Sequence, residues 1–140
     1  MKMSRRNTPK RQLRNLDQRS GQPRRLVVFS LRYIDINQGQ SFSDWESDEI
    51  LSQAMERLRQ VSSLTIGEAT AQQIIKVYGD FPPSEKTDFS HPRHVPEGVN
   101  WASCHIQGKP VIAGFVEDNI FHIVFLDKNH DFWKSELKNT

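Results

Sequence analysis

The sequence has little cysteine and no long hydrophobic run, and each shortage excludes a class of protein. A single cysteine, Cys104, among 140 residues cannot form an intramolecular disulfide, so the chain is not a small secreted domain held by disulfides. No apolar stretch approaches the ~18 residues that a transmembrane helix needs, and no apolar segment of a signal peptide follows the basic N-terminus. We therefore expect a soluble cytoplasmic protein that contacts no membrane.

The common catalytic motifs are missing as well. The chain has no Gly-rich phosphate loop, no zinc-finger spacing, no RNA-recognition signature and no Ser-His-Asp order typical of hydrolases. Cys104 stands beside His105, but adjacent residues of a strand point to opposite faces. We therefore interpret Cys104 as a small buried side chain rather than a nucleophile. No cofactor is expected.

The charge is divided between the two parts of the chain. Residues 1–25 carry nine Lys or Arg against the single acidic residue Asp17, a net charge of +8, whereas residues 26–140 carry ten basic and sixteen acidic residues, a net charge of −6. Residues 1–25 contain few aromatic and branched side chains, which predicts a flexible basic arm. Such an arm binds nucleic acid or another polyanion, makes the chain more soluble, or lies on its own acidic body. These three interpretations stay open.

Residues 26–140 have the pattern of a single α+β domain. Four alternating or continuous apolar runs predict strands, and two segments with apolar residues three or four apart predict helices. The expected strands are residues 26–36, 101–107, 111–116 and 120–126, and the expected helices are residues 47–62 and 66–78. The last three strands follow one another through hairpin turns, so we expect a three-stranded antiparallel meander packed against the helices.

Two local patterns refine this expectation. Ser43 and Glu46 have the spacing of a helix-capping box, and four prolines between Asp80 and Gly98 predict an irregular connection. Residues 120–126 are apolar at almost every position, which predicts a central strand with Phe121, Ile123 and Phe125 on one face and Ile120, Val124 and Leu126 on the other.

The histidines are the main candidates for chemistry. All five lie in the last fifty residues, at positions 91, 94, 105, 122 and 130. His122 interrupts the apolar strand, where a histidine is most often structural, and His130 follows the turn Asp127-Lys-Asn. Asp127 and His130 have a spacing that suits a metal ligand pair or an acid-base pair, but this short spacing arises often by chance and we assign no metal site.

A cluster of imidazole and cationic groups is suited to phosphodiester chemistry without a metal. We therefore predict His122, His130, Arg93 and His94 as catalytic residues, and further basic side chains as contacts to nucleic acid. The predicted nucleic-acid contacts are Lys128, Arg5, Arg6, Lys10, Arg11 and Arg14. Whether His105 and His122 share a face of the sheet depends on the hairpin register.

The segment GFVEDNIFHIVFLDKNHDFW, residues 114–133, resembles the C-terminal end of a group of small bacterial proteins of unassigned function. The order of one strand, two helices and a strand meander is similar to that of the RelE and YoeB toxins. That second resemblance implies a toxin-antitoxin role, with RNA or the ribosome as target and a cognate antitoxin as partner. No motif of the toxins maps residue by residue here, and the body is acidic where such toxins are basic.

Two hypotheses follow from the sequence. In the first, the chain is a small RNA-acting protein of the toxin type, and any enzymatic activity is that of a metal-independent ribonuclease. In the second, it is a non-enzymatic module that binds protein or nucleic acid, and its histidines are structural. The negative body argues against the first hypothesis because it repels RNA.

Overall fold

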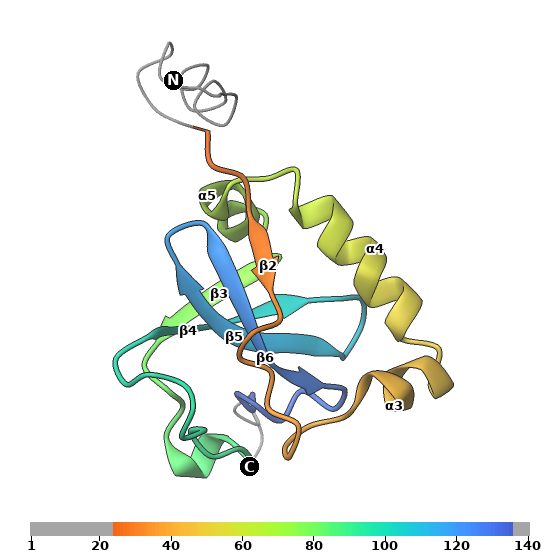
Figure 1. Cartoon of the computed structure of the whole chain (residues 1–140), viewed down its shortest axis with the longest axis vertical. Coiled ribbons are helices and arrows are strands. Elements are labelled where there is room, and N and C mark those ends of the chain that lie inside the picture. The colour runs from red at the N-terminus through yellow and green to blue at the C-terminus, as the bar shows by residue number, and fades with distance from the viewer. Residues whose placement is uncertain (1–23, 136–140) are drawn as a thin grey trace.

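The protein folds into a five-stranded sheet with helices on one face and a long loop on the other, as the computed structural model of residues 24–135 shows (Figure 1). The strand order is β2-β6-β5-β4-β3, with β2 parallel to β6 and every other pair antiparallel. The elements are β2 (Val28–Ser30), α3 (Phe42–Ser47), α4 (Leu51–Val61), α5 (Ile66–Ala71), β3 (Ile75–Gly79), the 3₁₀ turn η1 (Ser84–Lys86), β4 (Asn100–His105), β5 (Val111–Glu117) and β6 (Ile120–Asp127).

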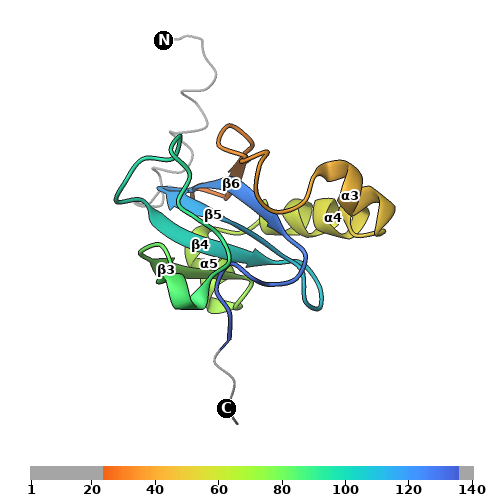
Figure 2. The same ribbon diagram turned by 90° about the horizontal axis from the view of Figure 1, so that it is seen from below.

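The α+β class expected from the sequence is therefore confirmed, and each face of the sheet has its own core. In Figure 2, α3 and α4 lie on one side of the strands and the connection between β3 and β4 lies on the other. Trp45, Val61 and Ile75 belong to the core beneath the helices. Trp101, Phe125 and Phe132 belong to the core beneath the long connection. No helix within residues 24–135 is long and apolar enough to cross a bilayer.

The first predicted helix corresponds to α4, which begins only at Leu51, and the separate short helix α3 precedes it. Ser41, not Ser43, caps α3, because its side chain accepts from the backbone of Asp44 while the Asp44 carboxylate accepts from the backbone of Ser41. Glu49 then takes a left-handed conformation with φ of 61°, which stops the helix before α4 begins. The expected helix over residues 47–62 is thus shorter, and α3 was not predicted as a separate helix.

The second predicted helix was too long. Thr65 and Glu68 form a capping box that starts α5, but Gln73 adopts φ of 64° and ends it. Residues 75–79 then pair antiparallel with β4, so the meander has four strands instead of three. Their β-branched and aromatic residues suit a strand, but only the presence of β4 as a partner decides between the two structures.

The first predicted strand, residues 26–36, was also too long. Its regular part, β2, ends at Ser30, whose hydroxyl accepts from the backbone N–H of Arg32 in a tight turn. The chain then runs beside β6 in irregular form, and the N–H of Asp35 donates to the carbonyl of Val124. β2 therefore forms a short edge strand of the sheet.

β6 is central, as expected, but a bulge changes which face its residues occupy. Ala113 of β5 pairs with Phe125, and Gly114 pairs with Ile123, so Val124 is an extra residue on β6. Phe121, Ile123 and Leu126 consequently lie in the helix-side core, whereas Val124 and Phe125 lie in the loop-side core. The predicted alternation holds through Val124 and is wrong for Phe125 and Leu126, because it assumed a regular strand with a period of two.

The connection over residues 80–99 is irregular, as its prolines predicted, but it is fixed by polar contacts. The Gln38 side chain donates to the carbonyl of Ser90 and accepts from its N–H. The N–H of Asp88 donates to the carbonyl of Asp131. Phe81 and Phe89 of this connection pack onto the loop-side core, so the connection covers that face of the sheet.

Candidate functional site

His122 lies near the start of β6 and is almost fully buried, with 6 % of its surface exposed. It sits opposite Phe115 in the sheet, and the Tyr33 ring meets it edge-on at a centroid distance of 5.0 Å. Its Nε2 lies 2.9 Å from a carboxylate oxygen of Glu117, whereas its buried Nδ1 has no hydrogen-bond partner in the part of the chain that the structure describes. Sequence reasoning that a mid-strand histidine is usually buried fits this position.

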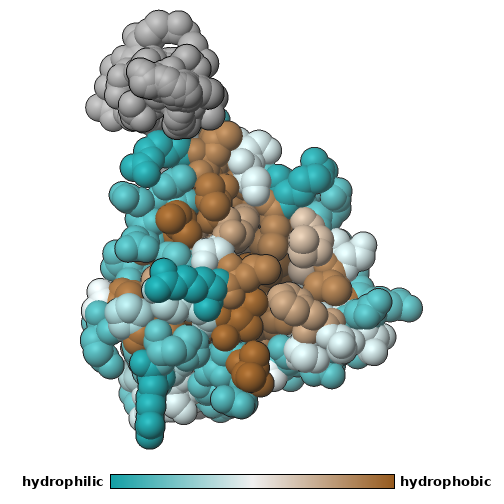
Figure 3. All heavy atoms as spheres, in the orientation of Figure 1, coloured by the Kyte–Doolittle hydropathy of each residue, from teal (hydrophilic) through white to brown (hydrophobic). Residues whose placement is uncertain are grey.

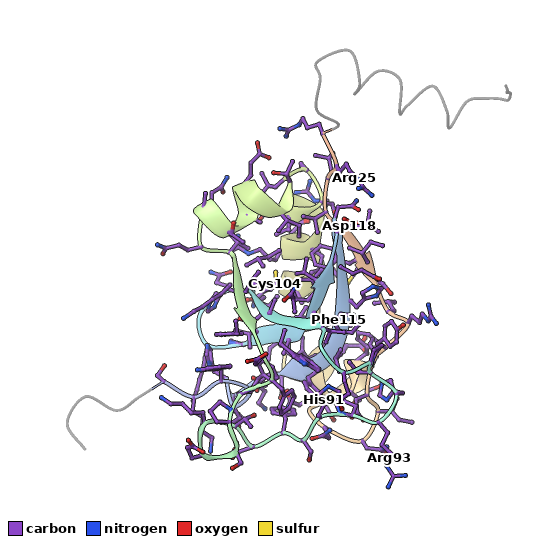
Figure 4. The ribbon with its side chains drawn as sticks, turned by 90° about the vertical axis from the view of Figure 1, so that its left-hand side faces the viewer. Arg25, His91, Arg93, Cys104, Phe115 and Asp118 are labelled. Carbon is purple, nitrogen blue, oxygen red and sulfur yellow. The ribbon has the colours of Figure 1, made fainter. Side chains whose placement is uncertain are left out.

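His94 and Arg93 lie in the long connection at the same end of the sheet. His94 stacks on the Tyr33 ring and its Nε2 lies 2.8 Å from the Tyr33 carbonyl oxygen. Tyr33 therefore lies between His94 and His122. Arg93 is exposed and points away from the domain in Figure 4, while His91 lies against the sheet.

His91 belongs to the loop-side core rather than to a catalytic group. Its ring packs against Phe81 and Trp101, each at a centroid distance of 5.4 Å. Nδ1 of His91 contacts the carbonyl of Pro92, and Nε2 is buried without a partner. The histidine thus helps to hold the connection on the sheet.

His130 lies at the opposite end of β6 from His122. Five residues of extended chain separate His122 from Asp127, which corresponds to about 16 Å at the usual rise per residue, and His130 follows the turn after Asp127. The four residues predicted as catalytic therefore do not meet at one place. His94 and His122 form one group, Arg93 points outward, and His130 stands apart.

His130 has a different imidazole as its neighbour. The rings of His105 and His130 lie 5.8 Å apart with an interplanar angle of 36°, and both residues are partly exposed. The pairing register explains their proximity, because His105 is opposite Val111, which is in turn opposite Asp127. His105 and His122 share the loop-side face of the sheet but lie at opposite ends of it.

Two cations accompany this imidazole pair. Lys76 is an exposed residue of β3, and the Nε of Arg57 on α4 donates to the carbonyl of Ile106, the residue after His105. Burial lowers the pKa of His105 below its ordinary value of 6.5, and the charges of His130, Lys76 and Arg57 lower it further. His105 is therefore neutral at neutral pH and available as a base.

Stacked aromatic rings lie beside the pair. The rings of Tyr78 and Trp133 lie parallel at a centroid distance of 4.4 Å, and the Lys76 ammonium lies 5.3 Å from the Tyr78 ring centre. Both aromatic residues are partly exposed. A flat aromatic surface next to cations is an arrangement that nucleic-acid bases and phosphates favour.

Asp127 supports the turn that positions His130. Its two carboxylate oxygens accept from the N–H groups of Asp131 and Phe132, and His130 takes a left-handed conformation with φ of 62°. Burial raises the pKa of Asp127, although these N–H donors and the charge of His130 oppose the shift. The Asp127-Lys-Asn turn expected from the sequence thus holds His130 in place.

The predicted nucleic-acid contacts are only partly within the described residues. Lys128 pairs with Asp48, with 2.8 Å between Nζ and the carboxylate, so its charge is already engaged. Arg5, Arg6, Lys10, Arg11 and Arg14 lie outside the residues that the structure describes. Within residues 24–135, no three His, Cys, Asp or Glu side chains are placed to hold a metal ion.

Cys104 is fully buried, which confirms the interpretation from the sequence. Burial raises the pKa of its thiol to about 12, so the reactive thiolate is nearly absent at neutral pH. We expect Ellman's reagent to modify no thiol in the folded protein at pH 8 and one thiol per chain in 6 M guanidinium chloride. Rapid modification under native conditions would contradict this placement.

Comparisons of the chain with protein-family models, with curated proteins and with solved structures gave no match. The candidate site therefore rests on its own geometry. His105 was one of the five candidate histidines but was not predicted as catalytic, and Lys76 was not predicted as a site residue. The position of His105 at the end of a predicted strand indicated that it could belong to a site. That His130 is its neighbour depends on the register of two hairpins.

Proposed function

We propose that the protein acts on RNA and cleaves it without a metal, using His105 and His130. The observation that carries this proposal is the pair of imidazole rings at 5.8 Å, in which burial, together with the charges of His130, Lys76 and Arg57, lowers the pKa of His105. Neutral His105 takes the proton from a 2′-hydroxyl, whose oxygen attacks the adjacent phosphorus. His130 gives a proton to the departing 5′-oxygen. The products are a 2′,3′-cyclic phosphate and a 5′-hydroxyl.

The surrounding groups have supporting roles in this proposal. Lys76 is placed to neutralise charge on the phosphate, and Tyr78 with Trp133 offers a surface on which a base stacks. The likeness to RelE toxins was drawn from two helices and a three-stranded meander, whereas residues 24–135 form three helices and a four-stranded meander, so the proposal does not rest on that analogy. A basic N-terminal arm, with its net charge of +8 over residues 1–25, would offset the repulsion between RNA and the acidic body.

The test is cleavage of a fluorescently labelled single-stranded RNA of mixed sequence by the full chain in EDTA. We expect His105→Ala and His130→Ala each to lower the rate by about 100-fold or more, the range typical of general acid-base groups. Arg93→Ala and His94→Ala serve as matched surface controls and should keep the full rate. DNA of the same sequence should not be cleaved, because it lacks the 2′-hydroxyl.

The pH dependence has a defined sign. Because the pKa of His105 is lowered from 6.5, most of His105 is still the neutral base at pH 6.5. On the acid side of the profile, the cleavage rate should therefore fall only below this pH. An unchanged rate in both histidine variants, or activity that EDTA abolishes, would refute the proposal. His122 remains a residue predicted from the sequence, and the variant His122→Gln in the same assay tests it.

A second candidate function is binding of a macromolecule without catalysis. An exposed apolar surface that extends from β2 to α4 favours it (Figure 3). RNA that is retained but not cleaved by the wild-type chain would support this function over the first.

A further inference from the structure

An apolar groove opens at the edge of the sheet, between β2 and the helices α3 and α4. Its volume is about 580 Å³, and nearly all of its lining side chains are apolar. Within residues 24–135, β2 is the outermost strand and pairs with β6 on one side only. In the view of Figure 3, which looks at this edge, hydrophobic residues form a continuous surface from β2 toward α4. The groove is therefore exposed along its length.

The side chains along the groove are unusually exposed for their type. The exposed fractions are 53 % for Val28, 58 % for Leu31, 43 % for Phe42 and 56 % for Met55. Single exposed apolar residues are ordinary, but a contiguous group of this kind marks a surface that another segment covers.

The rim of the groove near α3 and α4 is acidic. Glu46 and Glu49 are exposed, and neither makes an ion pair within residues 24–135. Both line a depression that continues from the groove past Leu51 and Met55. A segment that combines apolar side chains with several positive charges would complement this surface.

The chain itself contains such a segment just before β2. Residues 10–19, KRQLRNLDQR, carry four basic side chains and one acidic one, and Leu13 and Leu16 are three residues apart, the spacing of one helix face. Ser20-Gly-Gln-Pro23 follows, a composition typical of a turn. Residue 24 leads directly into β2 at the end of the groove (Figure 1).

The charge, the length and the chain position of residues 10–19 all suit this groove. We propose that residues 10–19 dock into this groove of their own chain, with Leu13 and Leu16 against Met55 and Leu31 and with the arginines toward Glu46 and Glu49. Ten residues span about 15 Å in the most compact regular form, a helix, and residues 20–23 link this segment to Arg24 before β2. The docked segment would cover the apolar side chains of the groove. This proposal is independent of the action on RNA.

Engineered cysteines test the proposal in the full chain, because the native Cys104 is buried and unreactive. Under mild oxidation, the pair Leu16→Cys with Met55→Cys should form a disulfide within one chain. The matched control pairs Leu16→Cys with Glu97→Cys, an exposed position in the connection on the opposite face. A tethered segment has an effective concentration in the millimolar range, so at 10 µM protein the bond should form about 100-fold faster within a chain than between chains.

The groove pair is expected to react at least tenfold faster than the control pair, at a rate independent of protein concentration. Equal rates for the two pairs would overturn the proposal. Disulfide-linked dimers that form in proportion to concentration would overturn it as well, and would instead assign the groove to a second copy of the chain.

A charge variant separates docking from simple proximity of the two cysteines. Adding Glu46→Lys and Glu49→Lys to the groove pair should slow the bond several-fold, whereas Asp80→Lys, an exposed acidic position after β3, should leave the rate unchanged. Equal rates in the two charge variants would contradict the proposed contact between the arm and the acidic rim.

Discussion

Gly114→Ala is expected to destabilise the protein by about 3 kcal/mol or more, at the upper end of what overpacking a core costs. A Cβ at this position would lie 1.9 Å from the carbonyl oxygen of His122. The obstacle is backbone on the neighbouring strand, so it cannot rotate away as a flexible side chain would. Relief requires β5 and β6 to separate at the bulge, where the central strands of the sheet meet.

Urea unfolding followed by tryptophan fluorescence measures this effect. Gly67→Ala is the matched control, since its added Cβ would have only the Thr65 hydroxyl within 4 Å, at 3.8 Å. Gly67 lies in α5, where alanine should raise stability by about 0.5–1 kcal/mol. Similar unfolding midpoints for the two variants would show that the close contact at Gly114 is absent in solution.

Phe132→Ala is the second substitution with a large expected effect, a loss of about 3–5 kcal/mol. Phe132 is 1 % exposed and follows the Asp127 turn. Its ring contacts Tyr78 of β3, Phe81 and Phe89 of the long connection, Trp101 of β4 and Phe125 of β6. Removing this ring leaves a cavity where the connection, the sheet and the C-terminal segment meet.

Amide hydrogen exchange tests this prediction locally, in addition to the global free energy of unfolding. We expect amides over residues 80–99 to exchange faster in Phe132→Ala, because the connection loses its contact with the sheet. Phe42→Ala, at a position with 43 % exposure on α3, should lose much less stability and leave that exchange unchanged. Equal destabilisation by the two substitutions would contradict the central position of Phe132.

The elements that sequence reasoning predicted best are those whose own residues decide their structure. The three C-terminal strands and the helix around Leu51 and Leu58 have strong periodic patterns, and the structure contains all of them. Residues 72–78 were predicted as the end of a helix, because their apolar residues are compatible with both the helix period and the strand period. Residues 75–79 form a strand because β4 offers hydrogen-bond partners along its length. The local sequence pattern does not show that such a partner strand is present.

The sequence predicted that histidines would form the candidate site, but it did not predict which histidines lie next to each other. Clustered histidines near the C-terminus pointed to His130, and the turn after Asp127 was read correctly from its residue types. Its partner is His105 rather than His122, since the hairpin registers place Val111 opposite both His105 and Asp127. A register is a property of paired strands, so a single strand's sequence cannot fix it.

Sequence by itself determined the α+β class, the central position of β6 and the buried state of Cys104, because each follows from which side chains avoid water. Tertiary structure alone decided the strand identity of residues 75–79, the faces of Phe125 and Leu126, and which imidazoles meet. These features depend on hydrogen bonds between segments far apart in the chain. One inserted residue, Val124, changes the face of its neighbours without altering hydrophobicity at any position.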